Sequence, residues 1–296
     1  WLRPENAMWR AANCRAMEDL EFREPSLDIS CGDGLFSFYM AGGRTDPAFD
    51  IFHATENLEN FFNNADIYNA TTDTYSPPVV EHPDRNITVG TDWKADLLDK
   101  ADELDFYKEL VEHDNNDPLP FEDNRFKTVF SNSTYWVENI DMHLSEIKRV
   151  THPDGKIYLV LKLSYITNWL DKLWEEHEEF LGSEVIEIID RGRSQNKKHL
   201  HTNEGWKERL EDAGLEVVDS RTTATQLHTR MWDIGLRPIS PFLIRMANGL
   251  PPAERTAIKE EWVDTFETLL APFAYPEVEY RDRQAAEKVF ILEPGE

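Results

Sequence analysis

Short apolar strands alternate with helices along residues 26–161 of the chain. Residues 156–161 form the most apolar of these strands, and the helix before them is marked by Leu144, Ile147 and Val150 at helical spacing. Strands that alternate with helices in this way indicate a parallel sheet covered on its faces by helices. We therefore expect an α/β fold with a three-layer, doubly wound, mostly parallel sheet and inserted helical segments.

Further elements follow from apolar spacing and from turn residues. The expected helices are residues 4–21, 35–40, 95–108, 164–181, 203–213 and much of 226–272. The expected strands are residues 26–30, 86–91, a short one closing at Asp114, 126–130, 156–161, 215–220 and 288–292. Residues 44–86 are rich in Asn, Asp, Thr and Pro but also in aromatics, so we expect an ordered insertion.

The elements divide the chain into a core and a lid. The expected Rossmann-like core comprises residues 1–163, 203–223 and 285–296 and carries the insertion at about 44–86. Residues 164–202 and 224–284 are the expected helical lid over an acceptor site. Their aromatic content suggests a partly apolar, flat-ringed or sugar-like acceptor.

The charge of the chain limits its partners. Its 296 residues include 57 acidic and 31 basic side chains, which gives a net charge of −26. Phosphate backbones and anionic membranes repel such a surface, so we expect neither as a partner. The sequence lacks an apolar run of membrane-spanning length and a charged-then-apolar leader, which predicts a cytoplasmic protein. Adaptation to a salt-rich host is an alternative reason for the acidity.

Carboxylates follow several of the expected strands. Asp28, Asp92 and Asp114 lie at strand ends, and Gly32 and Gly34 follow the first of them. Ligands of open parallel sheets bind beyond these ends. The turn has no full G-x-G-x-x-G pattern and no phosphate loop. Several carboxylates without a phosphate cradle favour an adenosine ligand with a positive centre, and the sulfonium S-adenosylmethionine fits.

Four stretches resemble the class I S-adenosylmethionine-dependent methyltransferases, in the order of that family. Residues 27–34 (LDISCGDG) are similar to its first motif, and residues 89–92 (VGTD) to its second strand. Residues 113–114 with 119–126 (LPFEDNRF) resemble its third motif and the LPF-x-D-x-x-F stretch. Residues 146–150 (EIKRV) with 153–155 (PDG) resemble the segment before its fifth strand.

The chain also departs from the family pattern. Ser30 and Asp154 stand where the family has glycine, and Lys127 stands where it has aspartate. The insertion before the second strand creates a rival to Asp92, because Asp50 lies 22 residues after Asp28, close to the usual interval. We favour Asp92, since a cleanly alternating strand precedes it.

The resemblance implies a set of cofactor-binding residues. Asp92 would bind the ribose diol and Asp114 the adenine amine, while the first turn would line the methionine and ribose end. The implied set is Asp28, Ser30, Gly32, Gly34, Asp92, Trp93, Asp114, Asn115, Ser131 and Asn132. Core packing is the alternative role for Trp93, and loop capping for Asn132. Cys31 is expected to be a small buried side chain.

Methyl transfer needs alignment more than a fixed catalytic group. Candidate catalytic residues are Tyr135, after the fourth strand, and His199 and His201, just before the helix that starts near Asn203. Histidine suits a general base near neutral pH. A solvated basic loop is the alternative for the histidines and core packing for Tyr135. No third ligand is spaced to complete a metal site with the histidines, so we expect no metal.

Together these features predict a methyltransferase that uses S-adenosylmethionine, releases S-adenosylhomocysteine and acts on a small-molecule acceptor. A different reaction of the sulfonium, such as cyclisation or transfer of another group, is one alternative. A catalytically silent cofactor-binding subunit is another, motivated by the departures at Ser30, Lys127 and Asp154. The sequence leaves the acceptor, the atom methylated and the oligomeric state open, with a homodimer as one option.

Overall fold

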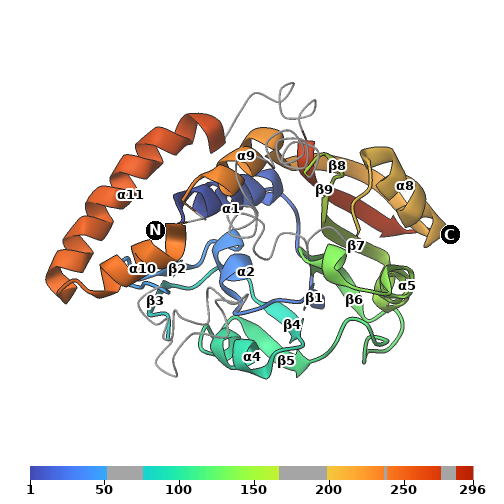
Figure 1. The fold of residues 1–296 in the computed structure, drawn as a ribbon. Coiled ribbons are helices and arrows are strands. Elements are labelled where there is room, and N and C mark those ends of the chain that lie inside the picture. The colour runs from blue at the N-terminus through green and yellow to red at the C-terminus, as the bar shows by residue number, and fades with distance from the viewer. Residues whose placement is uncertain (52–75, 167–198, 237–238, 275–284, 296) are drawn as a thin grey trace.

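A seven-stranded sheet forms the centre of the protein in the computed structural model (Figure 1). The structure describes residues 1–51, 76–166, 199–236, 239–274 and 285–295. The strand order is β5-β4-β1-β6-β7-β9-β8. These strands are β1 (Ser26–Ile29), β4 (Ile87–Asp92), β5 (Tyr107–Glu112), β6 (Phe126–Ser131), β7 (Thr151–Lys162), β8 (Leu215–Thr225) and β9 (Ala285–Pro294).

The sheet is parallel except at β9. β1 pairs in parallel with β4 and β6, and β9 pairs antiparallel with both β7 and β8. The carboxyl ends of β1, β4, β6, β7 and β8 therefore share one edge of the sheet, which we call the carboxyl edge. The amino end of β9 lies at the same edge. The expected mostly parallel, doubly wound sheet is confirmed.

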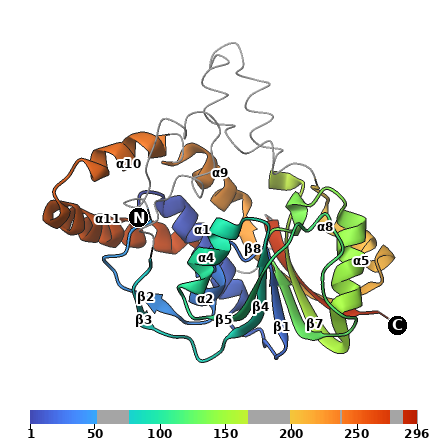
Figure 2. The same ribbon diagram turned by 90° about the horizontal axis from the view of Figure 1, so that it is seen from below.

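Helices cover both faces of the sheet (Figure 2). One face packs against α5 (Ile140–Val150) and α8 (Asn203–Asp212), with Trp206 and Leu144 fully buried there. The other packs against α1 (Pro4–Met17) and α2 (Leu35–Met40), where Met17 and Phe36 meet Phe130 and Val289. Burial of these apolar side chains is the main stabilising contribution to the fold.

Three helices lie on the α1 side, outside the central sheet. They are α9 (Gln226–Ile234), α10 (Ser240–Asn248) and α11 (Pro252–Ala274). Figure 1 shows α9 beside α1 and α11 on the outer side of α1. The described part of the sequence contains no helix both long and apolar enough to span a bilayer.

The expected helix at residues 95–108 is wrong in its second half. Helix α4 (Ala95–Asp102) ends early, and Leu110 and Val111 belong to strand β5. Asp105 has φ of +48°, a left-handed turn that a continuing helix cannot contain. The strand ends at Glu112, so Asp114 lies two residues beyond it.

Other boundaries shift by smaller amounts. Helix α1 ends at Met17 rather than residue 21, and β7 begins at Thr151 rather than residue 156. β8 extends to Thr225 because its second half pairs with the start of β9. In the insertion at 44–86, β2 (Arg44–Thr45) pairs with β3 (Val79–Glu81). Residues 52–75, and residues 167–198 of the helix and lid segment expected after β7, lie outside the described residues.

Candidate functional site

The turn after β1 runs through left-handed backbone. Ser30, Gly32 and Gly34 have φ of +58°, +59° and +74°. The family glycine that Ser30 replaces would adopt this conformation at little cost. The Ser30 hydroxyl compensates by accepting a hydrogen bond from Asn115 Nδ2 at 2.6 Å, which ties the turn to the loop after β5.

Gly32 and Gly34 serve different purposes. A Cβ at Gly34 would lie 2.8 Å from the Tyr107 ring, so this position needs glycine for packing as well as for its backbone. A Cβ at Gly32 would meet nothing within 4 Å. The backbone of Gly32 is thus open on that side, as a turn that lets a ligand come close must be.

Asp28 is buried on β1, 2 % exposed, and held by neutral donors. Its Oδ2 accepts hydrogen bonds from Ser37 Oγ at 2.6 Å and Tyr107 Oη at 2.8 Å. Burial raises the pKa of Asp28 to about 6 despite these donors, and nearby Asp92 adds to the rise. No described cation contacts this carboxyl group, so a positive ligand group would favour its charged form.

Asp92 ends β4 next to the β1 turn. Its Oδ2 accepts from Gly32 N at 3.1 Å and its Oδ1 from Lys94 N at 3.0 Å. Burial raises the pKa of this carboxyl group as well. Each carboxylate oxygen has capacity for a second donor, so the pair of oxygens can still receive a diol.

The rival Asp50 lies in a different environment. Its Oδ2 accepts from Arg255 Nη2 at 2.5 Å and from the indole of Trp1 at 2.6 Å. Asp50 therefore anchors α11 to the N-terminal segment, whereas Asp92 contacts the turn after β1.

Asn115 and Asp114 lie in the loop after β5. Asp114 is exposed, and its Oδ1 accepts from the backbone N–H and the side chain of Asn116. Trp93 is 64 % exposed, and the Lys94 ammonium lies 5.3 Å from its ring centroid. The alternative of a core aromatic is therefore wrong for Trp93, and its indole face is open to a flat ligand.

The loop after β6 adds further polar groups. Ser131 is buried and accepts from Ser133 N, and half-buried Asn132 follows it. In the loops after β5 and β6, three oxygens are buried without a hydrogen-bond partner among the described residues: Asn115 Oδ1, Ser133 Oγ and Thr134 Oγ1. Buried polar atoms are nearly always paired in native proteins, so these atoms indicate room for a donor-bearing ligand or water.

The candidate catalytic residues have separate surroundings. Tyr135 is buried, and the Lys162 ammonium lies 4.2 Å from its ring centroid. The ring of His199 hydrogen-bonds the carbonyl of Val137 through Nε2 at 2.7 Å.

His201 is held by packing and by a cation. Its ring packs edge-on against Trp206 with the ring centroids 4.7 Å apart, and Arg209 Nη1 lies 3.2 Å from its Nε2. Burial and the positive charge of Arg209 lower the pKa of His201. The two imidazoles therefore do not share one environment, and His199 is the one that contacts the segment after β6.

Sequence reasoning missed Ser37 and Tyr107, the donors to Asp28. Tyr107 was expected in a helix; it instead fills the space above Gly34 and Gly90, where a Cβ would lie 2.8 Å from its ring. A glycine inside a strand often marks such a close approach, so Gly90 was the available signal.

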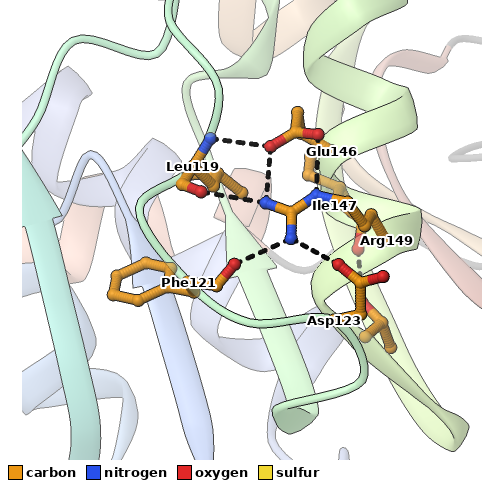
Figure 3. Close-up of polar contacts among 7 residues, drawn as sticks. Leu119, Phe121, Asp123, Glu146, Ile147 and Arg149 are labelled. Carbon is orange, nitrogen blue, oxygen red and sulfur yellow. Dashed lines mark hydrogen bonds and ion pairs between the residues drawn. The ribbon is translucent and has the colours of Figure 1, made fainter.

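Arg149 links the LPFEDNRF stretch to α5 (Figure 3). It donates to the carbonyls of Leu119 and Phe121 and pairs with both Glu146 and Asp123. Glu146 in turn accepts from Leu119 N at 2.8 Å. The EIKRV and LPFEDNRF motifs thus act together, because they fix the path of the chain between β5 and β6.

Comparison with known proteins finds one matching family model. Residues 74–159 match the family model described as a methyltransferase domain. The match begins after the β1 turn and spans β4 to most of β7. No curated protein sequence matches the chain significantly.

Solved structures resemble the fold at low sequence identity. A chain of a Haloferax volcanii complex containing a methyltransferase activator is 15% identical, with TM-score 0.48, covering 99% of this chain and 92% of that one. The [4+2]-cyclase SpnF gives 14%, TM-score 0.49, and coverage of 97% and 81%. Geranyl diphosphate C-methyltransferase from Streptomyces coelicolor gives 12%, 0.45, and 96% and 77%. None of these similarities assigns an acceptor or a partner.

The strand order, the single antiparallel strand β9 and the position of the family match agree with one another. The matched segment supplies β4 with Asp92 and the Arg149-linked motifs, and the unmatched β1 turn meets Asp92 through Gly32. Residues 74–159 therefore match a methyltransferase domain, and they lie within a seven-stranded, mostly parallel sheet.

Proposed function

We propose that the chain binds S-adenosylmethionine at the carboxyl edge and transfers its methyl group to a small-molecule acceptor. One observation carries this proposal: Asp28 and Asp92, on neighbouring strands, surround an open glycine turn and are held by neutral donors. Neither carboxylate is paired with a described cation, so both suit a positively charged, hydroxyl-bearing ligand.

The polar and aromatic residues at the carboxyl edge fit S-adenosylmethionine. Asp92 would hold the ribose diol, and the backbone around Gly32 would approach the methionine end. Asp114, Asn115 and the exposed face of Trp93 would surround the adenine, while Asp28, Ser131 and Asn132 would lie towards the reactive end. When bound, the sulfonium supplies an activated methyl group, and its product is S-adenosylhomocysteine.

The protein's own contribution is alignment and exclusion of water. Two of the three departures from the family pattern lie away from the carboxyl edge: Lys127 is exposed near the amino end of β6, and Asp154 is exposed near the amino end of β7. Ser30 keeps the left-handed backbone. This distribution supports a working enzyme over a silent subunit.

The helices on the α1 side suit a lid. α9 to α11 follow β8, whose carboxyl end lies at the carboxyl edge, and they lie beside α1 (Figure 1). We assign the acceptor to the side of this edge that faces the described helices α9, α10 and α11, within the expected lid segments 164–202 and 224–284, of which residues 167–198, 237–238 and 275–284 lie outside the described residues. Tyr135 and His199 are the candidate acceptor-contacting residues, with His199 as the candidate base if the acceptor loses a proton.

Calorimetry with S-adenosylmethionine tests the cofactor site. Replacing Asp92→Asn should weaken binding about 10- to 100-fold, because hydrogen bonds to charged groups contribute about 1.5–3 kcal/mol. Asp99→Asn removes the same charge from an exposed position of α4 and should leave binding unchanged. Equal affinities for wild type and Asp92→Asn would contradict the site.

Product analysis tests the reaction. Incubation of the protein with S-adenosylmethionine and candidate acceptors should yield S-adenosylhomocysteine and a methylated acceptor. The mass of the acceptor should rise by about 14 Da, because a methyl group replaces a hydrogen atom. Methylthioadenosine as the main product would instead indicate a different reaction of the sulfonium. Binding without turnover across all acceptors would favour a silent subunit.

A further inference from the structure

Tyr107 reaches Asp28 from the edge strand β5 across the neighbouring strand β4. Gly90 of β4 is the register partner of Asp28, and its lack of a side chain leaves room for the Tyr107 ring. A Cβ at Gly90 would lie 2.8 Å from Tyr107 Cδ1, and a Cβ at Gly34 would lie 2.8 Å from Tyr107 Cε2. Two glycines thus clear the path along which the Tyr107 hydroxyl reaches Asp28 Oδ2, at 2.8 Å.

Ser37 of α2 donates to the same oxygen of Asp28. Its Oγ lies 2.6 Å from Asp28 Oδ2, and its side chain is buried. A carboxylate oxygen accepts about two hydrogen bonds, so Oδ2 is fully used. Among the described residues, none donates a hydrogen bond to Oδ1 of Asp28. The two hydroxyls therefore fix the carboxyl group by one oxygen and leave the other to a ligand.

The described titratable groups that face Asp28 supply no positive charge. Asp92 of β4 adds a negative charge, and so would the thiol of Cys31 if it ionised. Burial raises the pKa of Cys31 and of Tyr107, so both stay protonated at neutral pH and Tyr107 remains a donor. The hydroxyls of Ser37 and Tyr107 are therefore the groups that favour the ionised form of Asp28, against the effects of burial and of Asp92.

We propose that Tyr107 and Ser37 are positioning residues of the cofactor site: they keep Asp28 ionised at neutral pH and reserve its Oδ1 for a positive group of S-adenosylmethionine. The inference rests on the proposed function, which puts the cofactor beside Asp28. Neither residue needs to touch the cofactor, because each acts through the carboxyl group. Without one donor, a larger share of Asp28 stays protonated at neutral pH, and a neutral carboxyl group attracts a cation much less.

Tyr107→Phe removes one donor and keeps the ring that packs over the two glycines. Calorimetry on the full chain measures the binding of S-adenosylmethionine between about pH 5.5 and pH 8. A hydrogen bond to a charged group corresponds to about one to two pH units, so the pH below which binding weakens should rise by that amount. At pH 6 the variant should bind about tenfold more weakly than the wild type, and at pH 8 the two affinities should agree within about twofold.

Tyr158→Phe is the matched control. Tyr158 is a buried tyrosine of β7 whose hydroxyl donates to a neutral group, the carbonyl of Glu21, at 2.8 Å. This variant should bind S-adenosylmethionine as the wild type does at every pH. Ser37→Ala should shift the pH dependence in the same direction as Tyr107→Phe, and it tests the proposal if Tyr107→Phe does not fold. In an Asp28→Asn background, Tyr107→Phe should no longer change the pH dependence, because the group through which it acts is absent.

Denaturant unfolding without the cofactor gives a second readout. The loss of stability in Tyr107→Phe relative to the wild type should grow between pH 5 and pH 8. The reason is that the lost hydrogen bond stabilises the ionised form of Asp28, which prevails at the higher pH. Tyr158→Phe should cost the same stability at each pH in this range, because its hydroxyl donates to a carbonyl that does not titrate.

The outcomes separate this inference from the function on which it rests. An affinity loss in Tyr107→Phe that is equal at pH 6 and pH 8 would overturn the inference, because altered packing alone would then explain it. An equal pH shift in Tyr158→Phe, or no shift in Tyr107→Phe and Ser37→Ala, would overturn it as well and leave the cofactor site standing. Failure of the wild type to bind S-adenosylmethionine would instead remove the proposed function and, with it, the ligand assigned to Oδ1. The unfolding measurement would then still decide whether the hydroxyls hold Asp28 ionised.

Discussion

Two buried carboxylate sites of this protein are built in opposite ways. Around Asp50, one oxygen receives the guanidinium of Arg255 and the indole of Trp1, and the ion pair is almost fully buried. Around Asp28 and Asp92, every described donor is a hydroxyl or a backbone N–H. In the sequence Asp50 and Asp92 were rival candidates for the ribose-binding carboxylate, and Asp28 was expected at the methionine end of the same ligand.

The difference lies in what each site still lacks. The charge of Asp50 is compensated within the protein, so this residue stabilises the junction of α11 with the N-terminal segment. Asp28 and Asp92 keep carboxyl groups whose pKa burial raises, and a cation from outside would lower the cost of ionising them. Anchoring and ligand binding can thus be told apart by the partner of the carboxylate rather than by its burial.

Breaking the anchor should have the largest effect on stability. Replacing Arg255→Met removes the guanidinium that Asp50 accepts from and leaves it the attraction of the Trp1 ammonium and Lys259, and we expect a loss of about 3–5 kcal/mol in the free energy of unfolding. Denaturant unfolding followed by circular dichroism measures it. The double variant Arg255→Met, Asp50→Asn should recover a large part of the lost free energy of unfolding, because the buried charge of Asp50 is gone. A loss below about 1 kcal/mol in Arg255→Met would show that the pair is not an anchor.

The same variants sharpen the comparison at the cofactor site. The double variant should bind S-adenosylmethionine as tightly as the wild type at a temperature where both are folded. A weakened affinity like that expected for Asp92→Asn would instead make Asp50 part of the ligand site.

Asp28 should make stability depend on pH in the direction opposite to an ordinary paired carboxylate. Its pKa is about 6 in the folded protein and about 3.8 when unfolded, so the folded state holds the proton more tightly. Stability from this group is complete below about pH 3.8 and is lost as the pH rises through about 6. The total loss is about 3 kcal/mol.

Comparison with Asp28→Asn isolates this effect. The free energy of unfolding of the wild type minus that of the variant should fall between pH 4 and pH 7. Bound S-adenosylmethionine should reduce the fall, because its positive charge favours ionised Asp28. If the difference in the free energy of unfolding between the wild type and Asp28→Asn does not change with pH in this range, the pKa of Asp28 is not raised in the folded protein.

Arg149 should have an intermediate effect, because its ion pairs are partly solvated. Arg149→Lys keeps the charge but cannot donate to Leu119, Phe121, Glu146 and Asp123 together, and we expect a loss of about 1–2 kcal/mol. Arg15→Lys, in an exposed pair with Glu18, is the control and should change stability by less than about 0.5 kcal/mol. Equal effects of the two substitutions would show that charge alone matters at Arg149.

Sequence reasoning predicted which residues meet at the carboxyl edge because the features there are local. Asp28, Gly32 and Gly34 follow a short apolar strand, and Asp92 ends a cleanly alternating one. Periodicity finds such strands, and the parallel order then brings their ends together. The structure shows the contact of Gly32 with Asp92 that this reasoning requires.

What the sequence did not reveal depends on contacts between distant residues. The expected helix at 95–108 ran into the start of β5 because Leu104 and Leu110 also fit helical spacing, whereas Asp105 in a left-handed turn separates the two elements. The pairing of Trp9 with Glu287 joins positions 278 residues apart. The buried, unpaired Glu5 Oε2 and Asn13 Oδ1 of α1 likewise become visible only in the folded structure.

Ser30 provides the smallest and most specific test of the cofactor edge. Its left-handed backbone costs about 1 kcal/mol relative to glycine, and its hydrogen bond with Asn115 returns about 0.5–1.5 kcal/mol. Ser30→Gly removes both the backbone cost and the hydrogen bond, so it should leave stability nearly unchanged. Ser30→Ala keeps the strained backbone and loses the bond, so it should be about 1 kcal/mol less stable than Ser30→Gly in denaturant unfolding. If the two variants are equally stable, the left-handed turn imposes no strain at this position. If Ser30→Ala is instead as stable as the wild type, the hydroxyl contributes nothing, and neutral hydrogen bonds are then not what holds this edge in place, which is the property that separates it from the Asp50 anchor.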